Sequence, residues 1–244
     1  MIVEFIGVTG SGKTTLINQV RHKLSSSWEV TTSSDLVTGL VGLQGIKNTT
    51  ARNLLQETIS FPYFLGSFPN HSQLISQTIR LFSRNTSLSV TMINNLRSIE
   101  RKLGGLEIAQ RQDQNKVILV DEGPFLTAHM FAFNDTPITK EEINEYSNLL
   151  PLPDLIIYIK ATTEVLLERS LNRSRPPREM KARNRSENEE YIKRAESLFD
   201  LMVKSSNIQS RMLIVDNSSP DLDAIDQSVE KISDFILTSA KGLN

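Results

Sequence analysis

The chain has 244 residues, of which 39% are hydrophobic and 23% charged, and its formal net charge at pH 7 is −1. This length is sufficient for one large α/β domain, residues 1–244, without a second core. The near-zero net charge provides no general attraction for nucleic acid, so we do not expect nucleic-acid binding. Because the chain has no cysteine, disulfides, thiolate metal ligands and thiol catalysis are excluded.

Membrane insertion and export are also not expected. No apolar run reaches the roughly 18 residues that a membrane-spanning helix needs. A strand-like run begins at Ile2, which leaves no room for a signal peptide. We therefore expect a cytoplasmic protein, in the compartment where ATP is abundant. The three histidines, His22, His71 and His129, are too scattered to form a zinc site.

Five runs of the sequence have the composition of β-strands, and stretches compatible with helices separate them. The runs are Ile2–Val8, Glu29–Thr32, Val117–Asp121, Leu155–Lys160 and Met212–Asp216. Strands that alternate with helices predict β-α-β units and a parallel sheet covered on both faces. The nearly continuous apolar character of the third and fourth runs favours strands buried on both sides. In such sheets, ligands bind beyond the carboxyl ends of the strands.

Residues 7–15 form the most specific motif in the chain. They read GVTGSGKTT and match G-x-x-x-x-G-K-S/T, the phosphate-binding P-loop or Walker A motif. The motif follows a strand-like run and precedes the helix-compatible segment Leu16–Val20, the context that a working P-loop requires. Its glycines allow the backbone to approach a phosphate closely, and successive N–H groups then face the anion. A Gly-rich turn without function is the alternative explanation of this pattern.

The motif predicts that the chain binds ATP and Mg²⁺. Lys13 would contact the β- and γ-phosphates, and the Thr14 hydroxyl would complete the Mg²⁺ shell. The residues predicted to bind ATP are Gly7, Thr9, Gly10, Ser11, Gly12, Lys13, Thr14 and Thr15.

Residues 35–115 are predicted to form two or three helices with loops that cap the site and bind an acceptor. Thr49–Ser60 and Asn85–Ile108 have helical patterns, whereas Phe61-Pro62 and Phe68-Pro69-Asn70 are expected to break the helix. Aromatic side chains beside these breaks could line the acceptor pocket, although clustered aromatics more often pack in a core. They are Phe61, Tyr63, Phe64 and Phe68.

The third strand-like run ends in two carboxylates, Asp121 and Glu122, and the turn Gly123-Pro124 follows. An Asp at the end of an apolar strand, downstream of a P-loop, commonly holds the Mg²⁺ of a nucleotide. Glu122 could accept a proton from an attacking hydroxyl or water. We therefore predict that Thr14 and Asp121 bind the metal, and that Lys13, Asp121 and Glu122 are catalytic.

A basic segment follows the fourth strand-like run. Its charged residues are Arg169, Arg173, Arg175, Arg178, Lys181, Arg183 and Arg185, with Glu179 as the only acid among them. A helix is predicted over Thr162–Asn172, with Thr162 or Thr163 as its N-cap. Pro176-Pro177 ends any helix there, and helical periodicity resumes at Ser186.

The resulting arginine-rich hairpin could neutralise the charge that phosphoryl transfer spreads over the equatorial oxygens. On this basis we predict that Arg173, Arg175 and Arg178 are catalytic. A solvated charged surface is one alternative. A contact with nucleic acid is another, but one short basic patch on a chain without net positive charge supports it poorly.

Together these segments resemble the P-loop nucleoside and nucleotide kinases, in particular the thymidylate kinase and deoxynucleoside kinase group. The likeness covers residues 1–33 and 116–240. Besides the P-loop, it depends on the Arg-x₃-Arg-x-Arg spacing of Arg169, Arg173 and Arg175 and on five further segments. These are Pro153–Lys160, Thr163–Arg169, Tyr191–Glu196, Leu213–Asp216 and Leu222–Ile232.

The resemblance implies a three-layer αβα fold with a five-stranded parallel sheet in the order 2-3-1-4-5. It also implies a lid at residues 173–186 that closes over ATP, with arginines that contact the phosphates or stack near adenine, and it adds Arg169 to the expected ATP site. Related kinases are often dimers, so helices within residues 85–112 could form a homodimer interface. Packing of the same apolar residues on the sheet explains them equally well.

Two departures from the family concern the acceptor. The family usually has Asp-Arg or Glu-Arg at the end of the third strand, where this chain has Asp121-Glu122. No clear acidic or arginine-containing motif follows the second strand, and Asp35 is the only acid nearby. Asp35 is therefore the candidate for acceptor binding or proton abstraction. The acceptor stays open among nucleotides, nucleosides and similar small hydroxylated or phosphorylated molecules.

The predicted function is an ATP-dependent phosphotransferase, a kinase that moves the γ-phosphoryl group of ATP to such an acceptor. An ATPase that uses Asp121 and Glu122 for hydrolysis is the first alternative, and Leu103–Leu106 faintly resembles the signature loop of transporter-type ATPases. A nucleotide sensor without catalysis is the second. The chain has no Asn-Lys-x-Asp motif of the kind that GTPases use to read the base.

Overall fold

The computed structural model describes residues 1–43, 46, 48–83, 90–113, 115–132, 137–173, 180 and 183–241. Its centre is a five-stranded sheet with the strand order β2-β3-β1-β4-β5, and every neighbouring pair of strands is parallel. The strands are β1 (Ile2–Ile6), β2 (Glu29–Thr32), β3 (Lys116–Val120), β4 (Leu155–Lys160) and β5 (Met212–Asp216). The predicted sheet order is therefore confirmed.

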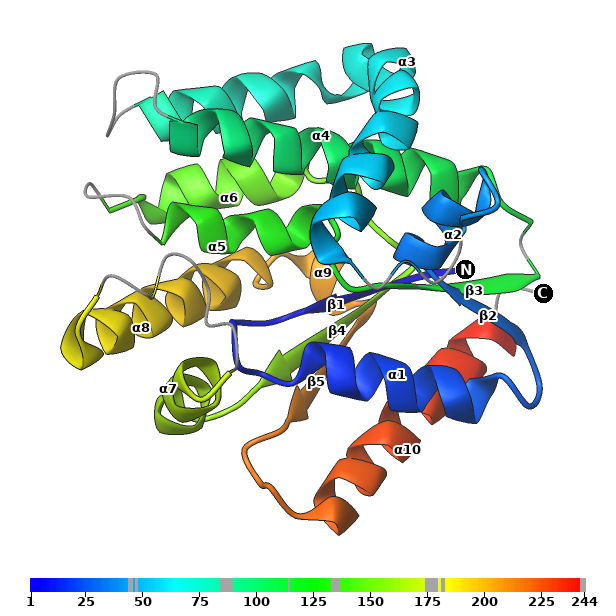
Figure 1. Cartoon of the computed structure of the whole chain (residues 1–244). Helices are drawn as coiled ribbons and strands as arrows, with labels where there is room; N and C mark the ends of the chain where they lie inside the picture. The colour runs from blue at the N-terminus through cyan, green and yellow to red at the C-terminus, as the bar shows by residue number, and fades with distance from the viewer. Residues whose placement is uncertain are drawn as a thin grey trace.

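Helices cover both faces of this sheet (Figure 1). One face carries α1 (Lys13–Leu24) and α10 (Leu222–Lys241), and the other helices lie mostly on the opposite face. Those helices are α2 (Ser33–Gly39), α3 (Thr49–Ser83), α4 (Val90–Gln110), the 3-10 helix η1 (Pro124–Thr127), α5 (Ala128–Phe131), α6 (Lys140–Leu149), α7 (Thr163–Leu171), α8 (Arg185–Met202) and α9 (Ser206–Gln209).

Alternate residues of each central strand enter two separate cores. Val3 and Phe5 of β1 pack with residues of α1 and α10, whereas Ile6 packs with residues of α4, α6 and α8. The strand β4 divides in the same way between Ile157 on the first face and Tyr158 on the second. Burial on both faces explains why β4 has almost no polar residue.

The two strands that carry the predicted site end slightly earlier than the sequence indicates. Strand β1 ends at Ile6 rather than Val8, and β3 ends at Val120 rather than Asp121. Because β1 and β3 are parallel neighbours, the P-loop and Asp121 emerge side by side from the carboxyl edge of the sheet. This is the edge at which the ligands of such sheets bind.

The predicted helix breaks at Pro62 and Pro69 are wrong, because α3 continues through both prolines for 35 residues. Each proline removes one backbone hydrogen bond, which costs about 3 kcal/mol in a helix interior. The extensive packing of α3 against α4 offsets this cost, since tertiary contacts stabilise helices more than propensity does. Figure 1 shows the accompanying bend: the first part of α3 lies beside α2, and the later part runs along α4.

Two other helix predictions are close to the observed elements. Thr162 caps α7, where its side chain accepts a hydrogen bond from the Val165 N–H. Helix α4 ends at Gln110, two residues beyond the predicted Ile108, and the start predicted at Asn85 lies outside the described residues. Among the helices in the described ranges, none combines the length and apolarity that crossing a bilayer requires.

Helices α3 and α4 approach most closely at Gly104. A Cβ atom added there would lie 2.3 Å from the backbone oxygen of Ser60, whereas one added at Gly105 would meet no atom within 4 Å. We expect Gly104→Ala to lower the free energy of unfolding by about 1–3 kcal/mol, because the helices must separate. Gly105→Ala is the matched control and should be neutral or stabilise by up to about 1 kcal/mol. Urea denaturation of both variants tests this, and equal midpoints would contradict the close crossing.

Candidate active site

The P-loop is held in place by the elements that surround it. Gly10 and Gly12 have φ angles of 84° and 89°, a backbone region that other residues rarely adopt. A Cβ at Gly10 would lie 2.4 Å from the Leu166 oxygen of α7, and one at Gly12 would lie 2.3 Å from Nδ2 of Asn217. Both the backbone conformation and the available space therefore require glycine at these positions.

The start of helix α1 is arranged as an anion site. Gly12 is the N-cap residue, and no side chain caps the helix. The first N–H groups of a helix have no partners within the helix and carry partial positive charge, so they attract phosphate when no side chain occupies them. Ser11 is buried within the loop, and Thr15 lies exposed in the first helical turn.

The Lys13 ammonium lies directly over the loop. Its Nζ donates hydrogen bonds to the backbone oxygens of Gly7, at 2.7 Å, and Val8, at 3.2 Å. Burial lowers the pKa of Lys13 to about 8. The negative charge of Asp121 raises this pKa, and the positive charge of Arg173 lowers it further. The predicted lysine therefore occupies the centre of a charged cluster at the end of β1.

A hydrogen bond joins the two residues predicted to bind Mg²⁺. The Thr14 hydroxyl donates to Oδ2 of Asp121 at 3.1 Å. Burial raises the pKa of Asp121, although the charge of Lys13 opposes the shift. A hydroxyl and a carboxylate are hard oxygen donors, and Mg²⁺ commonly takes only one or two protein ligands beside phosphate and water. The pair therefore fits this metal ion.

The second predicted carboxylate, Glu122, is paired with a cation from another element. Arg101 of α4 donates a hydrogen bond to Oε2 of Glu122 at 2.9 Å. Burial alone would raise the pKa of Glu122, but the charges of Lys102 and Arg101 outweigh it and lower the pKa. Arg101 of α4 therefore places a guanidinium beside Glu122, although the residue that follows Asp121 in the chain is itself a carboxylate.

A buried glutamate shapes the turn that carries these carboxylates. Glu4 lies in β1 and is only 1% exposed, and its Oε1 accepts a hydrogen bond from the Phe125 N–H at 2.8 Å. A Cβ at Gly123 would lie 2.2 Å from the Glu4 carboxyl carbon, so the turn requires glycine there. Sequence reasoning missed Glu4, although a single acid within the apolar run of β1 was a visible signal.

Glu4 is held in an unfavourable environment for a charge. Among the described residues, its Oε2 has no hydrogen-bond partner. Burial raises its pKa to about 8, despite the opposing charge of Lys102 and the hydrogen bonds from Phe125 and Leu126. An unpaired buried charge is strongly unfavourable, so the carboxyl is held mainly protonated at neutral pH. The group therefore acts as a neutral hydrogen-bonding support for the turn.

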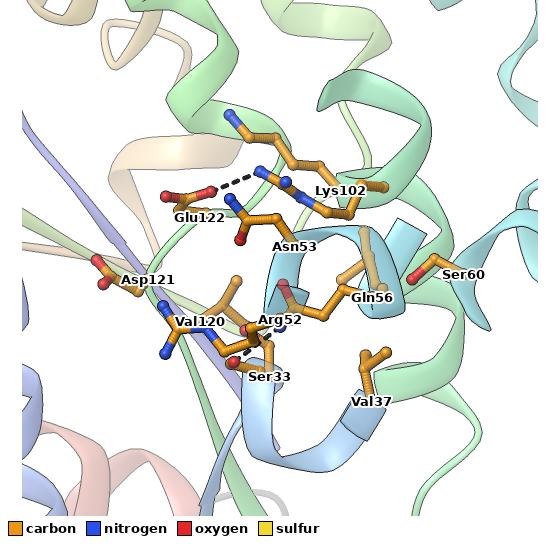
Figure 2. A pocket seen from close by; sticks show the side chains of 14 residues that line it. Ser33, Val37, Arg52, Asn53, Gln56, Ser60, Lys102, Val120, Asp121 and Glu122 are labelled. Carbon is orange, nitrogen blue, oxygen red and sulfur yellow. Dashed lines mark hydrogen bonds and ion pairs between the residues drawn. The ribbon is translucent and has the colours of Figure 1, made fainter. Parts of the chain in front are cut away.

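A polar cavity of about 100 Å³ adjoins Asp121 and Glu122. Figure 2 shows its lining side chains, which come from α2, α3, α4 and the end of β3. They are Ser33, Ser34, Val37, Arg52, Asn53, Gln56, Ser60, Arg101, Lys102, Leu106, Val120, Asp121 and Glu122, with Gly105 contributing backbone. Gln56 is fixed by a hydrogen bond of 2.7 Å from its Nε2 to the Ser34 hydroxyl. The helical region 35–115 thus supplies most of this cavity.

Asp35, the predicted acceptor-binding acid, does not line the cavity. Its carboxylate accepts a hydrogen bond from Arg21 at 2.7 Å, and its backbone N–H donates to the hydroxyl of Thr32, the N-cap residue of α2. Sequence reasoning missed Arg52, Arg101 and Lys102 because helical charged residues carry no distinctive motif. Their positions in the sequence do not indicate that the fold places them beside Asp121.

The aromatic residues predicted as possible pocket linings lie elsewhere. Phe61 and Phe68 are 48% and 43% exposed, and Phe64 packs against the core. The Tyr63 ring lies under the guanidinium of Arg111, with 5.0 Å between the guanidinium carbon and the ring centroid. None of these four side chains lines the cavity beside Asp121.

Of the predicted arginines, Arg173 lies near the site. Its charge contributes to the pKa values of both Lys13 and Asp121. Arg175 and Arg178 lie outside the described residues, as does most of the predicted lid at 173–186.

Arg169 lies behind the P-loop. It donates hydrogen bonds to the backbone oxygens of Asn217 at 2.7 Å and Ser219 at 3.4 Å. Asn217 in turn donates to the Ser11 oxygen at 2.8 Å. Arg169 therefore supports the loop through Asn217, a residue that no motif in the sequence singles out. Its direct contact with ATP stays a prediction.

Solved structures share this fold. A shikimate kinase from Bacteroides thetaiotaomicron matches with a TM-score of 0.50 at 13% sequence identity, and the match covers 97% of this chain and 98% of that one. A deoxyadenosine kinase from M. mycoides, solved with bound dATP, matches with a TM-score of 0.52 at 16% identity and covers 95% and 98% of the two chains. No protein-family model and no curated protein matches the sequence. The sheet order and the helices on both faces are thus those of P-loop kinases.

Replacing Glu4 by glutamine should change how stability depends on pH. Burial raises the Glu4 pKa from 4.5 to about 8, so between these values the folded chain binds a proton that the unfolded chain releases. Stability therefore falls as the pH rises through this window. Glutamine keeps the oxygen that Phe125 requires and carries no charge at any pH.

Relative to the unaltered chain, we expect Glu4→Gln to gain about 1.4 kcal/mol or more in unfolding free energy between pH 5 and pH 8, the value of one pKa unit. Urea denaturation at several pH values measures this gain. Glu230→Gln, at a largely exposed position, is the control. The same pH trend in both variants would contradict the shift at Glu4.

Proposed function

We propose that this protein is an ATP-dependent phosphotransferase that moves the γ-phosphoryl group of ATP to a nucleotide, nucleoside or similar small acceptor. The observation that carries the proposal is the juxtaposition of two sites. The P-loop, Lys13 and the Thr14–Asp121 pair form one site, and the polar cavity lined by Asp121 and Glu122 adjoins it. A hydrolase needs room only for water, whereas a kinase needs such a second binding site.

The residues of the P-loop would bind the donor. Backbone N–H groups at the start of α1 and the Lys13 ammonium would hold the phosphates, and Lys13 would neutralise charge on the γ-phosphoryl group during transfer. Thr14 and Asp121 would hold Mg²⁺, which when bound neutralises phosphate charge and orients the transferring group. Arg173 is close enough to Lys13 for its charge to affect it, which supports its predicted role. The catalytic roles of Arg175 and Arg178 remain predictions.

The acceptor would bind between α2, α3 and α4. The cavity combines the amide side chains of Asn53 and Gln56 with apolar walls at Val37 and Leu106. Amides orient a ligand by hydrogen bonds, and apolar walls bury its carbon atoms. Glu122 lies at the boundary with the donor site. A group at this position can orient the attacking oxygen or accept its proton. Pairing with Arg101 holds Glu122 there.

One observation that favoured the ATPase alternative, the resemblance of Leu103–Leu106 to a signature loop, does not agree with the fold. Leu103–Leu106, the segment that resembles a signature loop, lies within helix α4 and faces Ser60 of α3 at Gly104. A homodimer through residues 85–112 and a cytoplasmic location remain predictions.

Lys13→Ala and Asp121→Asn should each reduce acceptor-dependent ADP formation by about 10²-fold or more, because Lys13 would neutralise charge on the transferring group and Asp121 would hold the Mg²⁺ that does the same. The assay is ADP production with Mg²⁺ and ATP in the presence of nucleosides, nucleoside monophosphates and small hydroxylated metabolites. Lys23→Ala is the matched control, since Lys23 lies at the far end of α1 and pairs with Glu230 on the surface.

Two results would contradict the proposal. ADP formation that is independent of every acceptor and depends on Glu122 would identify an ATPase. Tight ATP binding without turnover on any acceptor would identify a nucleotide sensor.

A further inference from the structure

The cavity beside Asp121 is lined by more cationic side chains than carboxylates. Arg52, Arg101 and Lys102 line it together with Asp121 and Glu122. Glu122 pairs with Arg101, and the charge of Asp121 is opposed chiefly by Lys13 of the donor site, which is not among the lining residues of the cavity. Two cations, Arg52 and Lys102, therefore remain after the carboxylates have been assigned.

Lys102 is the first of these cations. It is only 5% exposed, and in the ranges that the structure describes, no hydrogen bond or ion pair of its ammonium occurs. The carboxylates of Glu122 and Asp121 attract it only from a distance, and Glu4 is mainly uncharged at neutral pH. A buried ammonium without a partner is costly for the fold, and an anion that enters the cavity would remove this cost.

Arg52 is the second. Its Nε is buried and has no hydrogen-bond partner, and its guanidinium forms no ion pair within the described part of the chain. It lies one helical turn before Gln56 in α3, so both side chains project from the same face of the helix into the cavity (Figure 2). A planar guanidinium from α3 and an ammonium from α4, both lining one cavity, suit a tetrahedral anion with several oxygens.

We propose that the acceptor is a phosphate monoester whose phosphate binds between Arg52 and Lys102, with Arg101 beside it. This inference rests on the proposed phosphotransferase function and narrows its acceptor. A phosphate monoester is mainly a dianion at neutral pH, because its second pKa is about 6, and it therefore balances the two unassigned cations. A carboxylate would balance only one, and a neutral nucleoside neither.

The acceptor phosphate would itself be the nucleophile. One of its oxygens attacks the γ-phosphorus of ATP, and a new P–O–P bond forms. The bond between the γ-phosphorus and the oxygen that bridges it to the β-phosphate breaks, and ADP leaves with that electron pair. The dianionic acceptor and ATP⁴⁻ become a trianionic diphosphate and ADP³⁻, so atoms and charge balance without a proton transfer. Arg52 and Lys102 would offset the repulsion between the two phosphates.

The test compares each acceptor with and without its phosphate. ADP formation is measured with eight nucleosides, their 5′-monophosphates, ribose 5-phosphate and glycerate. We expect at least one phosphate monoester to be used, and its dephosphorylated counterpart to have a kcat/KM lower by about 10²-fold or more, since an unpaired buried charge then remains. Equal or better use of a nucleoside, or use of glycerate alone, would overturn the inference.

Variants locate the phosphate. Arg52→Gln and Lys102→Met should each raise KM for the monophosphate by about 10–100-fold, the loss of a charged hydrogen bond, and leave KM for ATP unchanged. Arg97→Gln is the control, because Arg97 lies one turn before Arg101 and pairs with Glu57 away from the cavity. Arg52 is less buried than Lys102, so its variant remains informative if Lys102→Met fails to fold. Unchanged KM values for the monophosphate would overturn the assignment.

A failure of the kinase proposal is separable from a failure of this one. If no compound is phosphorylated, calorimetric titration of the same monophosphates in the presence of Mg²⁺ and ADP decides. Binding that Arg52→Gln and Lys102→Met abolish would uphold the phosphate site and reject the kinase. No binding of any monophosphate would reject the site.

Discussion

The hydrogen bond between Thr14 and Asp121 joins residues 107 positions apart in the sequence, and the rest of the site depends on the constraint that makes it possible. Strand β1 lies between β3 and β4, so the loops that follow β1 and β3 must leave the sheet as neighbours. The P-loop then meets the acidic end of β3, and the helices before β3 have to cover the space above it. The P-loop and the cavity beside Asp121 are in this way neighbours at the carboxyl ends of β1 and β3.

The same arrangement concentrates titratable groups where water is scarce. Burial raises the pKa of Glu4 and lowers the pKa values of Lys13 and Lys102, so that all three are about 8. Perturbed pKa values cluster at functional sites more often than elsewhere. Here the cluster extends behind the site, because Glu4 supports the turn at Gly123. The local cost in stability is balanced by the two large cores on either side of the sheet.

The sequence predicted the P-loop and the acidic end of β3 from local patterns with a fixed spacing, and the order of the strands from the resemblance to a kinase family. It did not predict Glu4, Asn217 or the cations of the cavity. Lys102 illustrates the reason: a lysine in a helix is ordinarily a solvated residue, and only the packing of α4 against the sheet buries it. The error at Pro62 has the same origin, because proline signals a helix end locally and packing against α4 outweighs that signal.

The backbone hydrogen bond that is missing at Pro62, within α3, has a further consequence. The first half of this helix carries Arg52, Asn53 and Gln56 into the cavity, and the second half is tied to α6 by hydrogen bonds of Gln77 and Arg80 to Glu145. Because Pro62 removes one backbone hydrogen bond between the halves, the helix backbone couples them more weakly than an uninterrupted helix would. The half that lines the cavity can therefore shift, or change in sequence, with little effect on the half that is packed against α6.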